Sequence, residues 1–511
     1  MELSRLVGRL FDVRPEQIDP GGGGADRAAA GNDTLVVGGG IAGISAAVVL
    51  AERGVRVTVL EAGPTLGGRL AAWPDTLPDG TAQQVEHGFH AFFRQYYNWR
   101  SILRRVHPQL RLLRQIDDYP VLSTTWPTEE FGGLPVAPPL NLLALVSRSD
   151  SLRLRDLRHM DGKAALPLLA YDPVRTHREL DDTTAAALLD SLRMPDRARA
   201  MLFEVFSHSF FNHEREMSAA EMVANFHFYF LGNPEGLRFD APDHDYDTAI
   251  WQPLAAHLGS HGALVLTGDP AVRVQPAADS GWQVVTASGS AHTARHLVLA
   301  VDPPALKHLV ADSPQLATAG PVLAGQVDAL AVGPPYAVAR YWLGGDVARS
   351  RPVFSGVSRQ STLDSITVYH RLERDAREWA ERTGGSVVEL HAYACDAHVP
   401  ATELAGRMRA ELAALWPEVS DLPVVALRAR VEARAPAFRP GGYANRPGVV
   451  TDADGVYLAG DGIRTDFPSA LMERAAATGI LAANHILRRA GAATEPLRSV
   501  RRRGLLARRH P

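Results

Sequence analysis

Residues 33–69 contain the feature that most constrains the fold of this chain. Their sequence, DTLVVGGGIAGISAAVVLAERGVRVTVLEAGPTLGGR, begins with a short apolar strand, residues 34–37, that leads directly into Gly38, Gly40 and Gly43. This G-x-G-x-x-G spacing lets a backbone turn tightly and approach a pyrophosphate. A helix would start at the last glycines, and its free N–H groups and positive dipole end would suit a diphosphate.

A second strand and an acidic residue complete a β-α-β unit. Gly54 stands where the helix cap belongs, and VRVTVLE forms a buried strand that ends at Glu61. Glu61 would bind the adenosine ribose hydroxyls beside Ala62, and Ile41 and Ala42 would start the helix at the pyrophosphate. A lone glycine motif also fits an ordinary turn, but these elements in register predict a dinucleotide site.

A further glycine pair favours flavin over nicotinamide. Gly67, Gly68 and Arg69 follow Glu61 closely, and such a pair with an arginine can follow the far side of a diphosphate, an addition that NAD-binding units do not need. The combination resembles the FAD-binding signature of the amine oxidase and carotenoid desaturase superfamily. The resemblance implies FAD as the cofactor.

A third motif lies near the other end of the chain. GVYLAGDG is a predicted buried strand that ends at Gly460 and Asp461, and a helix is predicted over residues 469–487. A glycine and aspartate after a strand are also a common turn. In the superfamily, however, this strand end implies Asp461 beside the ribityl and diphosphate groups. The helix start, with Met472, would face the isoalloxazine.

Composition excludes several other classes of protein. The net charge of −4 gives no basis for nucleic-acid binding by bulk electrostatics. Cys395 is the single cysteine, which rules out an internal disulfide and a cysteine-based metal cluster. No apolar run reaches the roughly 18 residues of a membrane span, and the N-terminus lacks the pattern of a signal peptide. We expect a cytoplasmic protein.

The predicted fold class is α/β: a Rossmann-like FAD-binding domain of the glutathione-reductase and amine oxidase type, with an interleaved mixed α+β substrate domain. Residues 1–32 are expected to be a flexible appendage because Gly21 to Gly24 resemble a linker. The expected FAD-binding domain comprises residues 33–118, 240–322 and 436–490. The substrate domain comprises residues 119–239 and 323–435, and residues 491–511 form a basic tail.

The segment EHGFHAFFRQYYN, residues 86–98, narrows the family further. It resembles an element of plant- and cyanobacterial-type phytoene and ζ-carotene desaturases. Together with FEVFSHSFF, HFYFLG and PYAVARYWL, it is most similar to bacterial β-carotene desaturase/methyltransferases, the isorenieratene-type aromatic-ring synthases. The resemblance places Glu86, His87, Gly88 and, in the adenine-side segment, Val272 at the cofactor.

The two histidines of this segment have alternative interpretations. His87 and His90 have no third ligand at a recognisable spacing, so a metal site is not favoured. They either hydrogen-bond the backbone of a glycine-containing turn beside the flavin or contact substrate or flavin directly. His90 and Glu473, which matches an M-E-x-A element of the desaturases, are the catalytic candidates, and neither is assigned as the base.

The aromatic middle and the basic tail each allow two interpretations. The rings of residues 203–211 and 226–230 either fill a core or line a tunnel for a hydrophobic polyene or isoprenoid substrate. The arginines of residues 498–509 either form a solvated tail or contact anionic lipid, which would place the protein peripherally on the inner face of the cell membrane.

The resemblance implies that FAD takes a hydride from a β-ionone ring. A methyl shift, proton loss and a second desaturation would then make the ring aromatic, with a quinone or O₂ as the electron acceptor. Desaturation or isomerisation of another isoprenoid or polyene remains an alternative. Amine oxidation is another, although the only lysines, Lys163 and Lys307, lie outside the expected context. A non-catalytic prenyl-binding module is the third.

Overall fold

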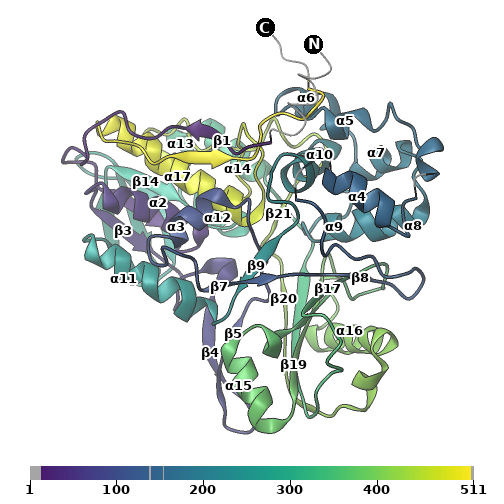
Figure 1. Cartoon of the computed structure of the whole chain (residues 1–511). Coiled ribbons are helices and arrows are strands. Elements are labelled where there is room, and N and C mark those ends of the chain that lie inside the picture. Colours follow the sequence, from purple (N-terminus) through teal and green to yellow (C-terminus); the bar gives the residue numbers. More distant parts are fainter. Residues whose placement is uncertain (1–12, 137, 139, 154, 508–511) are drawn as a thin grey trace.

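The computed structural model describes residues 13–136, 138, 140–153 and 155–507. It combines a parallel sheet flanked by helices, a second and mainly antiparallel sheet, and a group of short helices (Figure 1). The parallel sheet lies beside the short helices, and the second sheet lies below both in this view.

The parallel sheet confirms the predicted Rossmann-like fold. Its strands are short and apolar, as expected of a sheet that helices cover on both faces. All its pairings are parallel. The strand order is β10 (Leu264–Leu266), β3 (Val57–Leu60), β2 (Thr34–Val37), β14 (His296–Leu299) and β22 (Val456–Leu458).

Two helices that pack on this sheet also cross each other closely. α2 (Ile41–Glu52) follows the glycine turn, and α17 (Leu471–Arg489) packs across it. A Cβ atom at Gly479 would lie 2.2 Å from the carbonyl oxygen of Ala42, and one at Gly43 would lie 1.9 Å from that of Gly38. Only glycine therefore fits at either position, and the helix start is held against the strand end.

The second sheet carries α16 (Ala401–Leu415) on one face. Side chains alternate along its strands, so Val388 and Leu390 pack with α16 in one apolar core, whereas Glu389 and His391 point to the opposite face. The strand order is β20 (Val424–Glu432), β16 (Tyr336–Leu343), β19 (Ser386–Ala392), β18 (Ser365–Val368), β17 (Phe354–Val357) and β8 (Val121–Leu122).

Smaller elements connect the two sheets. A three-stranded meander packs against a helical group at the edge of the parallel sheet. Its elements are β11 (Ala271–Pro276), β12 (Trp282–Thr286), β13 (Ala291–Ala294), α12 (Pro303–Ala311), α13 (Pro314–Ala319) and α14 (Pro321–Ala329). Three short strands form a bridge, namely β6 (Phe92–Phe93), β9 (Phe239–Pro242) and β7 (Leu113–Ile116).

Helices account for most of the remaining chain. They are α3 (Tyr97–Leu103), α4 (Leu140–Arg148), α5 (Leu166–Leu169), α6 (Arg175–Leu180), α7 (Ala185–Ser191), α8 (Asp196–Arg199), α9 (Val205–His208), α10 (Ala219–Phe226), α11 (Gln252–Ser260) and α15 (Arg374–Thr383). None of the helices in the described part of the chain is long and apolar enough to cross a membrane.

One hairpin lies outside its expected domain. β4 (Ala72–Thr76) and β5 (Ala82–Glu86) were expected in the FAD-binding part, but Leu77 and Val85 share an apolar core with Trp342 and Trp379 of the second sheet and α15. This correction follows from tertiary packing, because a polar hairpin carries no sequence signal for the sheet that it joins.

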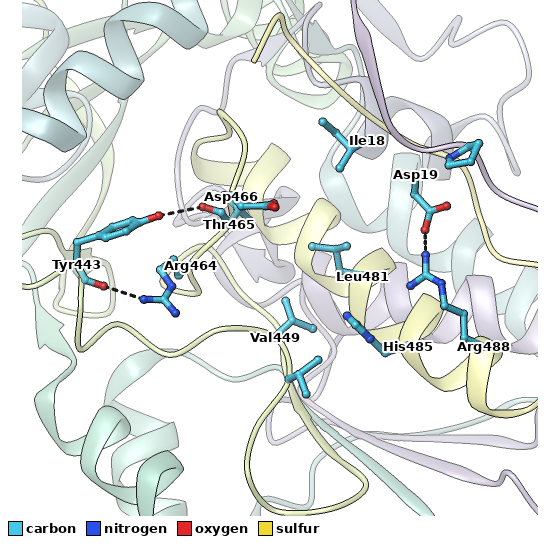
Figure 2. A pocket seen from close by; sticks show the side chains of 12 residues that line it. Ile18, Asp19, Tyr443, Val449, Arg464, Thr465, Asp466, Leu481, His485 and Arg488 are labelled. Atoms are coloured by element: carbon cyan, nitrogen blue, oxygen red, sulfur yellow. Dashed lines mark hydrogen bonds and ion pairs between the residues drawn. The ribbon is translucent and has the colours of Figure 1, made fainter. Parts of the chain in front are cut away.

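The N-terminal segment is also corrected. From residue 13 it is part of the fold: β1 (Glu16–Asp19) pairs with β23 (Leu497–Ser499). Figure 2 shows Asp19 facing Arg488 of α17 beside a surface pocket that Ile18, Leu481 and His485 also line. The glycines after β1 form a turn along the C-terminal segment, not a flexible linker.

The basic tail is bound to the protein as far as residue 507. The backbone N–H groups of Arg501, Gly504 and Leu506 donate to the carbonyl oxygens of Gly232, Tyr171 and Leu169, at 2.8, 2.8 and 3.0 Å. This corrects the expectation of a separate tail. Arg508 and Arg509 lie outside the described residues.

Asp19 ties the N-terminal strand to the end of α17. Its carboxylate accepts hydrogen bonds from Asn484 Nδ2 at 3.0 Å, from the backbone N–H of Gly21 at 3.0 Å and from Arg488.

We expect Asp19→Ala to lower the free energy of unfolding by about 1–3 kcal/mol, because it leaves buried donors without an acceptor. Chemical denaturation would measure this, with the exposed Asp26→Ala as the control. Equal stability of the two variants would contradict the anchoring role.

Glu473 joins α17 to the start of α3. Its carboxylate accepts from the backbone N–H and the Nδ2 of Asn98, at 2.9 and 2.6 Å, and from the backbone N–H of Trp99 at 3.1 Å. The first turn of α3 has no side-chain cap of its own. Glu473 therefore satisfies N–H groups that a helix start leaves without partners.

The protonation of Glu473 predicts a pH dependence of stability. Burial raises the pKa of the Glu473 carboxyl from 4.5 to about 8, against the opposing effect of the bonds from Asn98 and Trp99. Between these values the folded state holds a proton that the unfolded state has lost. The free energy of unfolding therefore falls with rising pH, by up to about 1.4 kcal/mol per pH unit.

Glu473→Gln should remove this contribution. Denaturation at a series of pH values would compare its slope with those of the wild type and the exposed Glu381→Gln. A slope in Glu473→Gln as steep as in the wild type would rule out the raised pKa.

Candidate functional site

A continuous cavity runs from the carboxyl ends of the parallel strands to the face of the second sheet opposite α16. Its first half is lined by glycines and small apolar residues from the turns after β2, β3 and β22. Its second half is lined by aromatic side chains from the 86–98 segment, the short helices and the second sheet. The expected cofactor and substrate regions are thus parts of one space.

The first half has the form of a diphosphate cradle. Gly40, Gly68 and Gly460 line it, and a Cβ atom at any of them would meet no protein atom closer than 3.5 Å. These glycines therefore leave room for a ligand and not for other protein atoms. α2 begins at this point without a side-chain cap, so its first N–H groups face an anion-binding position. FAD fits this donor set.

The predicted residues around this cradle divide into two groups. Gly43 does not line the cavity but permits the close packing of the helix. Twelve others line it: Gly38, Gly40, Ile41, Ala42, Glu61, Ala62, Gly67, Gly68, Arg69, Gly460, Asp461 and Met472.

Glu61 is positioned at the end of β3, as predicted. Its carboxylate accepts from the backbone N–H of Gly39 at 2.6 Å and of Gly63 at 2.7 Å, and it lines the cavity near Pro270 and Ala271. It thereby holds the glycine turn. Carboxylate oxygens can accept further bonds, so the ribose hydroxyls fit beside it.

The prediction for Val272 is wrong with respect to its side chain. Val272 is 41% exposed and does not line the cavity, whereas Ala271 does. The register of β11 shifts between Ala271 and Arg273, which turns the intervening side chain outward.

Arg69 and Asp461 close the cradle from opposite ends of the chain. The guanidinium of Arg69 forms an ion pair with the Asp461 carboxylate across the cavity wall. Burial lowers the pKa of Arg69, but the charge and hydrogen bond of Asp461, together with Tyr336 and Asp302, outweigh this effect, and the net direction is upward. Met472, at the start of α17, lines the cavity next to them.

The 86–90 loop lies between the two halves of the cavity. His87 and His90 line the cavity, but Glu86 and Gly88 do not, which corrects their assignment to direct cofactor contact. Glu86 instead accepts from Arg340 at 2.9 Å and from Tyr369. Gly88 has a φ of 118°, and a Cβ atom there would lie 3.0 Å from the ring of His391.

His90 hydrogen-bonds the backbone of the glycine-containing turn, which is one of the two interpretations given above. Its Nδ1–H donates to the carbonyl oxygen of Gly88 at 2.8 Å, and the Tyr246 hydroxyl accepts from its backbone N–H at 3.0 Å. Burial lowers the pKa of His90 to about 4 and that of His87 to about 3. Both imidazoles are therefore neutral near pH 7, and His90 is a weak proton acceptor.

The assignment of Glu473 as a catalytic candidate is corrected. Its carboxylate is engaged by the start of α3 and does not line the cavity. The sequence match to the desaturases therefore marks a helix contact beside the cofactor cradle and not a group that reaches substrate.

The aromatic runs serve as both wall and core. Phe206, Phe210, Phe211 and Tyr229 line the second half of the cavity. Phe203 and Phe226 instead stack on each other, with ring centroids 5.8 Å apart. Some rings of the short helices face the cavity and others face the protein core. Both interpretations of the aromatic runs, cavity wall and core, therefore hold, each for different residues.

Several polar side chains of the second sheet line the cavity near the 86–90 loop, and the sequence did not predict them at the site. Asp364, Ser365, His391 and Tyr393 line the cavity, and Glu389 lies behind them. The signal was present in SVVELHA, where an acid and a histidine two residues apart in a strand share one face. Within the described residues, no group of three or more His, Cys, Asp or Glu could hold a metal ion.

Solved structures show the same fold at low sequence identity. Putrescine oxidase bound to putrescine superposes with a TM-score of 0.66 at 17% identity, covering 89% of this chain and 99% of that one. Reduced UDP-galactopyranose mutase gives a TM-score of 0.59 at 14% identity, covering 89% and 95%. These matches support the fold alone.

Sequence relatives are more specific. A carotenoid phi-ring synthase from Streptomyces griseus is 44% identical, with 92% of this chain and 90% of that protein covered. A carotenoid phi-ring synthase from Chlorobaculum tepidum is 30% identical, covering 98% and 96%. The model of the family described as flavin containing amine oxidoreductase matches residues 41–487. The cradle, the fold and these matches agree, and the chain belongs to the flavin-containing amine oxidoreductase family.

Proposed function

We propose that this FAD-dependent oxidoreductase acts on a carotenoid and converts a β-ionone ring of β-carotene, or of a related carotenoid, to an aromatic ring by desaturation with methyl migration. The observation that carries this proposal is the single cavity that joins the glycine cradle to an aromatic wall. Similarity over nearly the whole chain to two phi-ring synthases supports it.

The second half of the cavity fits a substrate without polar groups. The hydroxyls of Tyr96 and Tyr229 lie 2.8 Å apart and bond each other, and the Tyr119 hydroxyl donates to the carbonyl oxygen of Leu237 at 2.6 Å. The hydroxyls of Tyr96, Tyr119 and Tyr229 are therefore satisfied within the protein. The faces of the aromatic rings remain available to contact the ligand, and a polyene, which is apolar, requires such a surface.

Bound FAD supplies the hydride acceptor for oxidation of a C–H bond. The chain itself binds and orients: the glycines of the cradle leave room for the diphosphate, Glu61 offers a carboxylate to the ribose, and the aromatic wall keeps the substrate ring in place. The same wall excludes water, which would otherwise quench a carbocation on the ring. A quinone is the proposed electron acceptor, with O₂ as the alternative.

The other functions have less support. Lys163 is exposed, and Lys307 donates to the carbonyl oxygen of Asp328 at 2.7 Å, so neither lines the cavity. An amine oxidase that uses a lysine beside the flavin is therefore disfavoured. A non-catalytic prenyl-binding module would not need the open cradle at Gly40, Gly68 and Gly460.

Production in cells that accumulate β-carotene tests the reaction. We expect the purified protein to be yellow with bound FAD and the cells to contain carotenoids with one or two aromatic rings, identified by chromatography and mass spectrometry. Gly40→Val is the matched control, because its side chain would fill the cradle and abolish flavin binding and conversion. Unchanged β-carotene beside FAD-loaded protein would overturn the substrate assignment, and peroxide release with amines would favour the oxidase.

We also propose peripheral contact with the inner face of the cell membrane, where a carotenoid substrate is dissolved. Leu166, Val174 and Leu506 are 47, 70 and 45% exposed. They lie on α5, beside the start of α6 and on the basic tail bound along α5. Exposed apolar side chains next to arginines are typical of surfaces that contact anionic lipid.

Vesicle flotation tests this surface. The wild type should float with anionic vesicles more than with zwitterionic ones, because each basic residue near an anionic surface contributes about 1 kcal/mol. The double variant Leu166→Asp/Leu506→Asp should lose most of this binding. Leu264→Asp, at an exposed leucine of β10, is the control. Equal flotation of the two variants would contradict the proposed surface.

A further inference from the structure

A chain of hydrogen bonds opens onto the cavity where the 86–90 loop meets the second sheet. It begins at the Tyr393 hydroxyl, which lies 3.3 Å from Ser365 Oγ and 3.2 Å from His391 Nδ1. It continues from His391 Nε2 to Glu389 Oε1 at 2.8 Å. Tyr393, Ser365 and His391 all line the cavity, and the function proposed above has so far given them no role.

The register of the second sheet creates this chain. Ser365 of β18 and Val338 of β16 flank His391 of β19 in neighbouring strands, and Arg340 flanks Glu389. Because side chains alternate along a strand, Glu389 and His391 share the face that looks into the cavity. Three neighbouring strands of the sheet, β16, β18 and β19, therefore supply one constellation.

The charges fix the direction of the hydrogen bonds. Burial raises the pKa of Glu389, but the guanidinium of Arg340, 2.8 Å away, and His391 outweigh it and hold this pKa at about 2. Glu389 is therefore an anion that can only accept. A neutral His391 donates to it from Nε2, and the lone pair of Nδ1 then faces the Tyr393 hydroxyl. Tyr393 then donates to Nδ1 and presents an oxygen lone pair to the cavity.

We propose that Tyr393 and His391, oriented by Glu389, form the proton relay that deprotonates the substrate ring. This inference rests on the proposed function, because every hydride that leaves the ring on the way to an aromatic product must be matched by the loss of a proton.

The step balances without a further reagent. The C–H bond next to the cationic ring carbon breaks, and its electron pair becomes the new C=C bond. The proton binds the Tyr393 oxygen while the tyrosine's own proton passes to His391 Nδ1. The resulting imidazolium is stabilised by the Glu389 carboxylate, and its proton later returns to solvent.

The earlier candidates lack this arrangement. His90 uses Nδ1 in its bond to Gly88, and burial holds its pKa at about 4. Glu473 does not line the cavity. The charged and titratable groups that face the relay are His90, Arg340, Asp364, Glu389, Tyr393 and Arg430.

Turnover of two variants tests the relay. Tyr393→Phe keeps the ring and removes the hydroxyl, and His391→Gln removes the acceptor. Each should slow the formation of aromatic product by about 100-fold or more, the usual size of a general-base contribution. His370→Gln is the matched control, since His370 is a buried histidine bonded to the backbone of β19 at Val387 and does not line the cavity.

Cofactor and ligand binding separate a relay from a packing role. The FAD content and the binding of β-carotene should be unchanged in Tyr393→Phe and His391→Gln, while the rate of product formation falls. Normal rates in either variant, or a loss of FAD or β-carotene binding that accounts for the slower turnover, would overturn the relay. Failure of the wild type to convert β-carotene would instead overturn the proposed function.

Nitrogen-15 NMR of histidine-labelled wild-type protein gives a readout that needs neither turnover nor a stable variant. We expect the His391 signal, recognised by its loss in His391→Gln or by through-bond assignment, to show a protonated Nε2 and a free Nδ1 at neutral pH. The opposite tautomer would exclude proton transfer from Tyr393 to His391 and would overturn the relay.

Discussion

The buried ion pairs of Arg340 are the interaction on which the centre of this molecule depends. The guanidinium lies 2.9 Å from the Glu86 carboxylate and 2.7 Å from that of Glu389. It thereby joins the loop that separates the two halves of the cavity to the second sheet. Removal of one partner of such a group would leave an uncompensated charge in the interior, a cost of several kcal/mol. The loop and the cavity wall are therefore held as one unit.

This arrangement explains how two different environments share one cavity. The parallel sheet supplies backbone N–H groups and glycines, which suit a charged diphosphate. The short helices and the second sheet supply rings whose polar atoms are already bonded, which suits an apolar ligand. The 86–90 loop lies at the junction, with neutral imidazoles facing the cavity. A polar group and an apolar group can thus occupy the two halves of one cavity.

The cofactor cradle could be predicted because its signals are local. Gly38, Gly40 and Glu61 act within one β-α-β unit, so their spacing fixes their positions. Predictions failed where the outcome depended on distant contacts. A sequence motif made Glu473 a catalytic candidate. Its carboxyl group instead accepts hydrogen bonds at the start of α3, which lies about four hundred residues earlier in the chain. Asp19 belongs to the fold because β1 finds a partner at the other end of the chain.

The sequence by itself determined the Rossmann-like unit and the presence of an aromatic middle, because glycine geometry, apolar periodicity and terminal acids are properties of short segments. The resemblance of its glycine motifs to a known FAD-binding signature implied the cofactor. Only the tertiary structure decided which rings line the cavity, that Val272 turns outward, and that His391 and Tyr393 line the cavity with Glu389 behind them. The physical reason is strand register: a side chain's neighbours across a sheet are set by hydrogen bonding between segments that no local pattern connects.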